Sequence, residues 1–212
     1  MPDLLITLGR TMGFALTSGV NLYATIAMLG LAARYHWVAL PPQYDVFASD
    51  WVIGIAAMLY LVEFVADKIP WVDSLWDSAH TVIRPVGGAL VAVATLGQQT
   101  PTLEALVALL GGTIAAGSHL TKASTRVAAN ASPEPFSNWF LSLIEDLFVV
   151  GLGFVALKYP VAALVITVVI VVTIAMMIRW IVGKLRGWRR RAAVARRTQF
   201  VSSSSRCSWR PR

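Results

Sequence analysis

Residues 161–182 read VAALVITVVIVVTIAMMIRWIV and contain no ionisable side chain before Arg179. A helix rises about 1.5 Å per residue, so about 20 apolar residues cross the hydrocarbon layer of a bilayer. This stretch is long enough to do so, and it predicts a lipid-facing membrane helix. The composition of the whole chain agrees, because 57% of its 212 residues are hydrophobic and only 14% are charged. Soluble domains carry about 25% charged residues.

Five further apolar stretches precede this one, and together they predict an all-α bundle of transmembrane helices. We expect a single transmembrane domain at residues 1–183 and a basic, disordered cytoplasmic tail at residues 184–212. The start of the chain lacks the features of a cleaved signal peptide, so the first helix is predicted to be retained. The predicted spans are residues 11–33, 51–66, 85–97, 103–126, 139–157 and 161–182.

Positive charge is concentrated at the C-terminal end of the chain. Residues 179–212 contain eleven Lys and Arg and no acidic residue, which gives them a net charge of +11. Because the whole chain has a net charge of +7, residues 1–178 have a net charge of −4. Basic residues beside membrane spans favour the cytoplasm, and an even number of spans places both termini there. The sequence therefore predicts a bacterial inner-membrane protein. We expect its tail to contact anionic lipid headgroups and no specific nucleic acid, and an oligomer is left open.

Ionisable and polar side chains lie within or at the ends of these apolar stretches. Such groups are costly in hydrocarbon, so they normally face the bundle interior or a wet cavity and mark a functional path. The sequence predicts a charged cavity inside the bundle and no cofactor. The predicted cavity residues are Asn21, Glu63, Asp67, Arg84, His119, Lys122, Arg126, Glu145 and Asp146.

His119, Lys122 and Arg126, called the basic stripe below, are spaced to share one face of a helix. They could bind an anionic group such as a lipid phosphate, or they could be solvated in the cytoplasm. Glu145 and Asp146 could carry a proton or cation, or they could form structural ion pairs with Lys122 or Arg126.

Residues 69–83 match neither a span nor an ordinary loop. Their spacing predicts an amphipathic helix at the level of the lipid headgroups, with a re-entrant segment as the alternative. Its polar side is called the 73–84 face below. A solvated helix side explains this face better than a divalent-metal site, for which no tight ligand motif is present. The face comprises Asp73, Asp77, His80 and Arg84, and the first three are the metal-ligand candidates.

The two halves of the chain share short sequence patterns. Gly-Val-Asn-Leu begins at Gly19 and Gly-Ser-His-Leu begins at Gly117, and Glu63 and Glu145 lie in similar apolar contexts further along each half. Three spans per half would place the halves in opposite orientations, as in transporters built from inverted repeats. Low-complexity apolar sequence produces such matches often, so both duplication and coincidence remain as readings. Asn21, within the first pattern, could break its helix or bond to a neighbour.

Several longer polar motifs resemble a bacterial integral-membrane family. The family is catalogued as domain of unknown function 4126, and the resemblance covers roughly residues 10–180. It implies a membrane protein and brings no activity with it. The motifs are GVNLYAT at 19–25, EFVADKIPWVD at 63–73, WDSAHT at 76–81, IRP at 83–85, HLTKASTR at 119–126 and SPEPFSNW at 132–139.

The leading functional hypothesis is a small transporter that moves an anionic solute or a lipid, with a carboxylate coupling the movement to protons. Two alternatives stay open. One is a scaffold that recruits a partner through residues 69–84 and the tail, and the other is a membrane-embedded metal-dependent enzyme. Enzymatic activity is not the expectation, because the chain contains no phosphate-binding loop, nucleophile elbow or zinc-protease motif.

Overall fold

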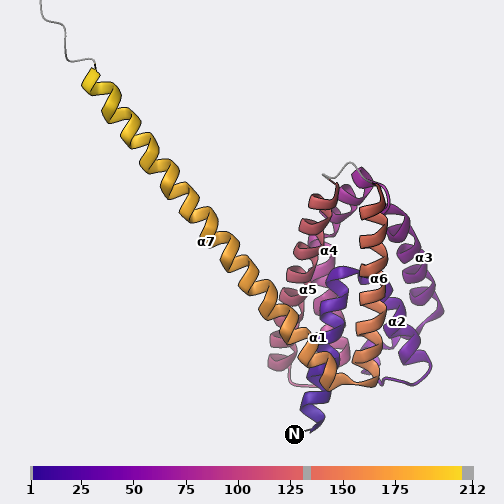
Figure 1. The fold of residues 1–212 in the computed structure, drawn as a ribbon. Coiled ribbons are helices and arrows are strands. Elements are labelled where there is room, and N and C mark those ends of the chain that lie inside the picture. Colours follow the sequence, from indigo (N-terminus) through magenta and orange to yellow (C-terminus); the bar gives the residue numbers. More distant parts are fainter. Residues whose placement is uncertain (1, 131–134, 207–212) are drawn as a thin grey trace, which may run out of the picture. The chain divides into compact units, whose positions relative to one another are not determined.

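The computed structural model describes residues 2–130 and 135–206. All regular structure within these ranges is helical, which confirms the predicted all-α class (Figure 1). The elements in chain order are α1 (Pro2–Val20), α2 (Leu22–Arg34), the 3-10 helix η1 (Pro42–Ala48), α3 (Asp50–Ala66), α4 (Pro70–Leu96), α5 (Pro101–Asn130), α6 (Pro135–Lys158) and α7 (Pro160–Arg206).

The chain divides into two compact units, Met1–Val171 and Val172–Arg212. The boundary falls inside α7, as does the predicted domain boundary at residue 183. The first unit contains every predicted site residue. In the second unit α7 is helical as far as Arg206, where the sequence predicted a disordered tail from residue 184. Residues 207–212 lie outside the described part, and the cytoplasmic position of the tail stays a prediction.

Four helices are long and apolar enough to cross a membrane: Pro70–Leu96, Pro101–Ala129, Asn138–Lys158 and Pro160–Lys184. A fifth span results if η1 and α3, which are bent by 54° relative to each other, are counted as one. α1 and α2 are apolar but shorter. Among the described residues the chain thus has the helices of a multi-pass membrane protein, with four or five such spans where six were predicted.

The first predicted span is divided at Asn21 into α1 and α2. The backbone of Asn21 is extended, with φ −147° and ψ 101°, and its side-chain Oδ1 accepts a hydrogen bond from the Ala24 N–H. Asn21 therefore caps the N-terminus of α2. Interrupted helices persist in membranes where their backbone groups meet protein partners or a cavity, so the break marks a polar region of the bundle. The corresponding region of the second half, α5, has no break.

Residues 69–83 form the N-terminal half of α4, which continues through Pro85 to Leu96. The third predicted span, residues 85–97, is therefore only the second half of a longer helix. The 73–84 face exists as predicted, but it points into the protein, where each of its four residues is at most 5% exposed. The helix is therefore present as predicted, but the prediction that its polar side is solvated is wrong. Lipid favours the opposite arrangement, with the apolar side of the helix outward.

Small residues allow α1, α4 and α5 to approach closely. A Cβ atom at Gly19 of α1 would collide with the Ser118 hydroxyl and the Ala115 backbone of α5, and one at Gly111 would collide with Ala92 of α4. Close contact of this kind replaces the hydrophobic driving force that is missing in lipid. The consequence is that the basic stripe of α5 lies directly beside the broken helix and α4.

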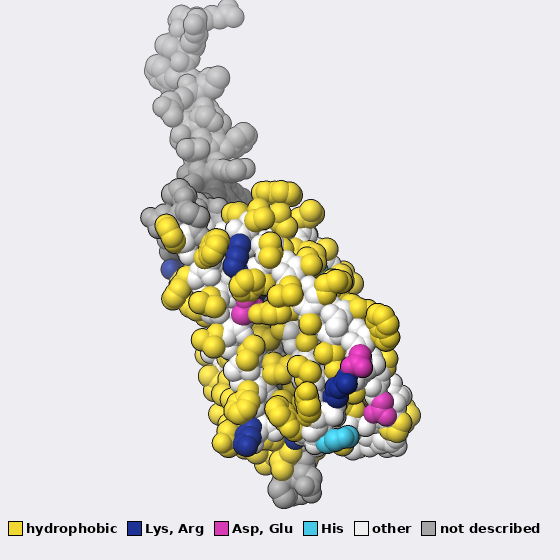
Figure 2. Space-filling model, turned by 90° about the vertical axis from the view of Figure 1, so that its right-hand side faces the viewer, with side chains coloured by type: hydrophobic (Ala, Val, Ile, Leu, Met, Phe, Trp, Pro, Cys, Tyr) yellow, Lys and Arg dark blue, Asp and Glu magenta, His cyan; other side chains and the backbone are white. Residues whose placement is uncertain are grey.

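The surface of the first unit is apolar and part of its interior is charged. Leu61, Leu109 and Leu147 are 61%, 70% and 71% exposed, whereas Glu63 and Arg84 are fully buried. Figure 2 shows one face on which hydrophobic side chains dominate and charged ones are few. This reverses the distribution found in soluble proteins. A lipid surrounding explains both halves of the pattern.

Candidate functional site

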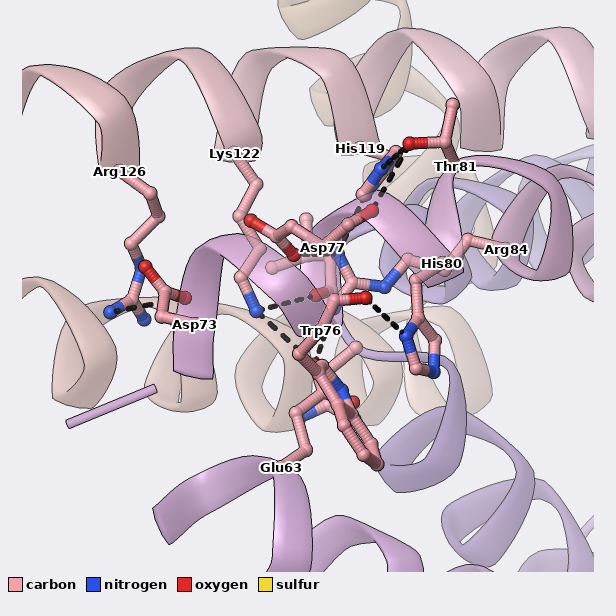
Figure 3. A network of polar contacts seen from close by, with 12 residues as sticks. Glu63, Asp73, Trp76, Asp77, His80, Thr81, Arg84, His119, Lys122 and Arg126 are labelled. Carbon is pink, nitrogen blue, oxygen red and sulfur yellow. Dashed lines mark hydrogen bonds and ion pairs between the residues drawn. The ribbon is translucent and has the colours of Figure 1, made fainter. Parts of the chain in front are cut away.

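The basic stripe lies on α5 and is buried, since none of its three residues is more than 4% exposed. α5 is one uninterrupted helix, so residues three and four apart share a side. Figure 3 shows Lys122 and Arg126 directed from α5 towards carboxylates of neighbouring helices, with His119 beside Arg84. The alternative of a stripe solvated in the cytoplasm is therefore wrong.

Arg84 of α4 binds residues of three helices. Its guanidinium donates to Glu63 Oε1 of α3 at 2.5 Å, to Asp77 Oδ1 at 3.1 Å and to His119 Nδ1 of α5 at 2.7 Å. Because an arginine can only donate, His119 Nδ1 accepts, and its Nε2–H is left to donate to the Thr81 hydroxyl at 3.3 Å. His119 is thus a neutral imidazole that orients Arg84.

Lys122 of α5 is bonded to acids and to the end of α1. Its Nζ lies 3.1 Å from Glu63 Oε1, 3.2 Å from Asp67 Oδ2 and 3.7 Å from Glu145 Oε2. It also donates to the Val20 carbonyl at 3.3 Å. A cation at the C-terminus of a helix is stabilised by the backbone dipoles. Lys122 therefore holds the broken helix and the acidic side chains of α3 and α6 together.

Arg126 makes the most extensive contacts with the acids. Its NH2 lies 2.6 Å from Glu145 Oε2 and 2.9 Å from Asp67 Oδ2, its NH1 donates to the Asp67 carbonyl at 2.8 Å, and Asp73 Oδ1 is 4.0 Å away. Glu145 accepts from both Nε and NH2, the two-point geometry that makes arginine–carboxylate pairs strong. One reading of Glu145 from the sequence was a structural ion pair with Lys122 or Arg126, and the structure contains these contacts.

Acids outnumber bases in this set of buried side chains, called the charge network below. One carboxylate oxygen on each of four acids, Glu63, Asp67, Asp77 and Asp146, has no hydrogen-bond partner among the described residues. Uncompensated charge is costly away from water, so surplus carboxylates are stable only with bound protons or cations. The network comprises the acids Glu63, Asp67, Asp73, Asp77, Glu145 and Asp146 and the bases Arg84, Lys122 and Arg126.

Asn21 links the helix break to the network. Its Nδ2 donates to Asp146 Oδ1 of α6 at 3.4 Å, while its Oδ1 caps α2 through the Ala24 N–H. Both sequence-based readings of Asn21 are therefore confirmed, because it breaks the helix and also bonds to a neighbouring one. The ends of α1 and α2 thus meet Lys122 and Asp146, respectively.

His80 lies apart from the acids of its own helix. Its Nε2 accepts from the Tyr23 hydroxyl at 2.9 Å, its Nδ1–H donates to the Trp76 carbonyl at 2.7 Å, and its ring stacks on Trp76 with centroids 4.6 Å apart. Both ring nitrogens are therefore used. Within the described residues no group of three His, Cys, Asp or Glu is arranged to hold a metal ion. The geometry gives the candidate metal site at Asp73, Asp77 and His80 no support.

The predicted cavity residues do not include Tyr23, Trp76 and Lys68, although all three lie in the motifs that resemble the family. Lys68, in the turn after α3, donates to the Phe64 carbonyl and the Ser142 hydroxyl and lies 3.1 Å above the Phe64 ring. Burial lowers the pKa of its ammonium group, an effect that nearby Asp146 and Asp67 oppose. Tyr23 had one signal, since it lies two residues after Asn21. Trp76 and Lys68 each have one partner four residues away, His80 and Phe64, and further partners that are distant in the sequence, Tyr23 and Ser142.

An open cavity of about 180 Å³ reaches the network between α4 and α5. We call it the α4–α5 notch. Its polar lining consists of Asp73, Ser74, Asp77, Ser78, Thr81 and Arg126. A larger groove of about 470 Å³ between α3 and α4 is lined by apolar side chains such as Leu61, Val65 and Trp76. The notch is thus a cavity through which water or a polar ligand could reach the charges.

The family model for the domain of unknown function DUF4126 matches residues 8–180. The chain belongs to this family. The match contains the whole charge network and ends at the start of the basic C-terminal region, so the resemblance read from the motifs is confirmed. Neither the curated proteins nor the solved structures contain a match to the chain. Since DUF4126 is defined without an activity, the function is argued from the geometry of the network.

Proposed function

We propose that this protein is a small transporter of the bacterial inner membrane that moves an oxyanion, either a free solute or the headgroup of a lipid, together with protons. The observation behind the proposal is that Lys122 and Arg126 sit in a buried network whose acids outnumber its bases. Ionisable groups at membrane depth mark transport paths by default.

The charge surplus explains how an anion could be coupled to protons. Lys122 and Arg126 are occupied by Glu63, Asp67 and Glu145, so an incoming oxyanion has to displace a carboxylate. A displaced carboxylate adds uncompensated negative charge to the buried network, which favours proton uptake by one of the network's acids. Binding of the anion and uptake of a proton are thereby linked, as reciprocal coupling requires.

The break between α1 and α2 supports the same reading, and an inverted repeat would agree with it. Transporters of this kind bind their ligands near the membrane midplane, where half-helix ends point at charged groups. Here the ends of α1 and α2 meet Lys122 and Asp146. The glutamates at equivalent places in the two proposed repeats, Glu63 and Glu145, also contact the same residue, Lys122.

We place both termini in the cytoplasm. The positive-inside rule assigns the eleven Lys and Arg of residues 179–212, and with them the C-terminus, to that side. An even number of spans then puts the N-terminus on the same side. In this orientation the basic residues would contact the anionic lipids of the inner leaflet.

The proposal is tested by flux into proteoliposomes with an imposed pH gradient. One arm measures the flipping of fluorescent phosphatidylglycerol, and the other measures the uptake of labelled inorganic phosphate. We expect flux in one arm above that of protein-free vesicles, and we expect it to collapse when a protonophore removes the gradient. Flux in the lipid arm identifies a headgroup as the cargo, and flux in the phosphate arm identifies a solute. Background rates in both arms would contradict the proposal.

The α4–α5 notch should be reachable from water. In a Cys207→Ser background, Ser78→Cys should react with a charged, membrane-impermeant thiol reagent, because Ser78 lines the notch. Leu75→Cys is the matched control: Leu75 is 66% exposed on the same helix but does not line the notch. Its thiol should face lipid, where thiolate formation is suppressed, and should react at least about tenfold more slowly. Equal labelling of the two variants would rule out a wet notch.

A further inference from the structure

Glu145 and Asp146 are neighbours in the sequence but have different surroundings. Glu145 lies within 4.0 Å of both Lys122 and Arg126. Among the described residues no basic group lies within that distance of Asp146, although Asp146 is only 7% exposed. Its Oδ1 accepts one hydrogen bond, from Asn21, and its Oδ2 has no hydrogen-bond partner. Asp146 is thus the acid of the network that the bases leave uncompensated.

The groups around Asp146 are mostly acidic or neutral. The carboxylates of Glu63 and Asp67 are close enough to act on Asp146 electrostatically. The ammonium groups of Lys68 and Lys122 also act on it, but they donate hydrogen bonds to other acceptors. Such surroundings make proton binding to this carboxylate more favourable than to an exposed one. The facing groups are Asn21 at the α1–α2 break, Tyr60 and Glu63 of α3, Asp67 and Lys68 of the following turn and Lys122 of α5.

We infer that Asp146 is the group of this network that binds and releases the transported proton, and that the helix break at Asn21 responds to its charge. This inference rests on the proposed transport function and names its proton site. The step is a simple protonation, in which Asp146 Oδ2 gains a proton from water and later returns it. A proton needs only one such oxygen, whereas hard metal ions need about six oxygen ligands. No metal-holding group exists in the described part of the chain.

Asn21 connects the proton to the backbone. Its Nδ2–H bonds more strongly to a carboxylate than to a carboxylic acid, while its Oδ1 holds the first turn of α2. Loss of the proton therefore tightens the contact between α6 and the start of α2, and gain of the proton loosens it. Lys122 on the Val20 carbonyl fixes the other side of the break. The break is thus placed between the proton site and the oxyanion-binding bases.

Infrared difference spectroscopy of the reconstituted protein tests the inference without transport. Exposed carboxyl groups are also protonated at low pH, so the diagnostic signal in the wild type is a protonated carboxyl band that persists after those of the exposed acids have disappeared as the pH rises. This band should be lost in Asp146→Asn, which preserves shape, and retained in Asp45→Asn, whose carboxylate is exposed on η1. Persistence of the band in Asp146→Asn, or its absence from the wild type, would overturn the inference.

A second variant keeps the test decisive if Asp146→Asn fails to fold. Asn21→Ala removes the single donor to Asp146, which disfavours the charged form. The band should then persist to a higher pH than in the wild type, and an unmoved titration would count against Asp146. Band titration in a protein without flux would uphold the proton site and reject the transport proposal. Flux in a protein without a titrating band would uphold the transport proposal and reject Asp146 as the proton site.

Discussion

Arg84→Ala should be the most destabilising single substitution in the charge network. It leaves the carboxylates of Glu63 and Asp77 buried without their guanidinium and removes the donor to His119. Removing one partner of a buried ion pair costs about 3–5 kcal/mol. We expect the variant to lose its monodisperse elution from detergent at a much lower temperature than the wild type, measured by size-exclusion chromatography after heating.

The matched control is Arg34→Ala. Arg34 pairs with Asp50, but the two side chains are 45% and 79% exposed. Exposed pairs contribute about 0–1 kcal/mol, so this variant should behave like the wild type. Adding Glu63→Gln to Arg84→Met should recover part of the loss, because it removes a stranded charge. If Arg84→Ala proves as stable as Arg34→Ala, the charges of the network are not buried as the structure has them.

Lys122→Gln should reduce flux in proteoliposomes by at least about tenfold, equivalent to about 1.4 kcal/mol. Lys122 touches Glu63, Asp67, Glu145 and the Val20 carbonyl, so it joins the oxyanion site to the helix break. Glutamine keeps a hydrogen-bond donor there but loses the positive charge. Glu63, Asp67 and Glu145, which lose their contact with the ammonium group, can take up protons. The fold should therefore tolerate this change better than the loss of Arg84.

Lys158→Gln is the control for the flux experiment. Lys158 is exposed near the end of α6 and makes no ion pair with the charge network among the described residues. The control removes the same charge and should transport at the wild-type rate. Thermal stability of both variants must be measured alongside, because a misfolded protein also transports nothing. A folded Lys122→Gln variant with unchanged flux would refute the role of Lys122 in the path.

Helical periodicity explains which parts of the site were predictable. The basic stripe and the 73–84 face were both read correctly as shared faces, since residues three and four apart always meet on one side of a helix. Periodicity gives no direction for that side. The sequence predicts a solvated 73–84 face, but this face is the inner side of α4 because the surrounding lipid contacts the apolar side chains.

Apart from the pairing of Glu145 with Lys122 or Arg126, the pairings between helices were beyond the sequence. Arg84 meets Glu63 across 21 residues and Lys122 meets Glu63 across 59, and no local pattern specifies such contacts. The same reason explains Glu145 and Asp146. Their opposite surroundings depend on which helices pack against each side of α6, although the two residues are adjacent in the chain.

The sequence by itself determined that this chain forms apolar helices with ionisable groups at membrane depth, because hydrophobicity and helical period are local properties. Only the tertiary structure decided that α1 and α2 part at Asn21 and that α4 runs unbroken through Pro85. It also decided that Asp146, within the part of the chain that the structure describes, has no basic group within 4.0 Å. Those outcomes follow from distant side chains competing for the same few buried partners, and that competition exists only once the helices have packed.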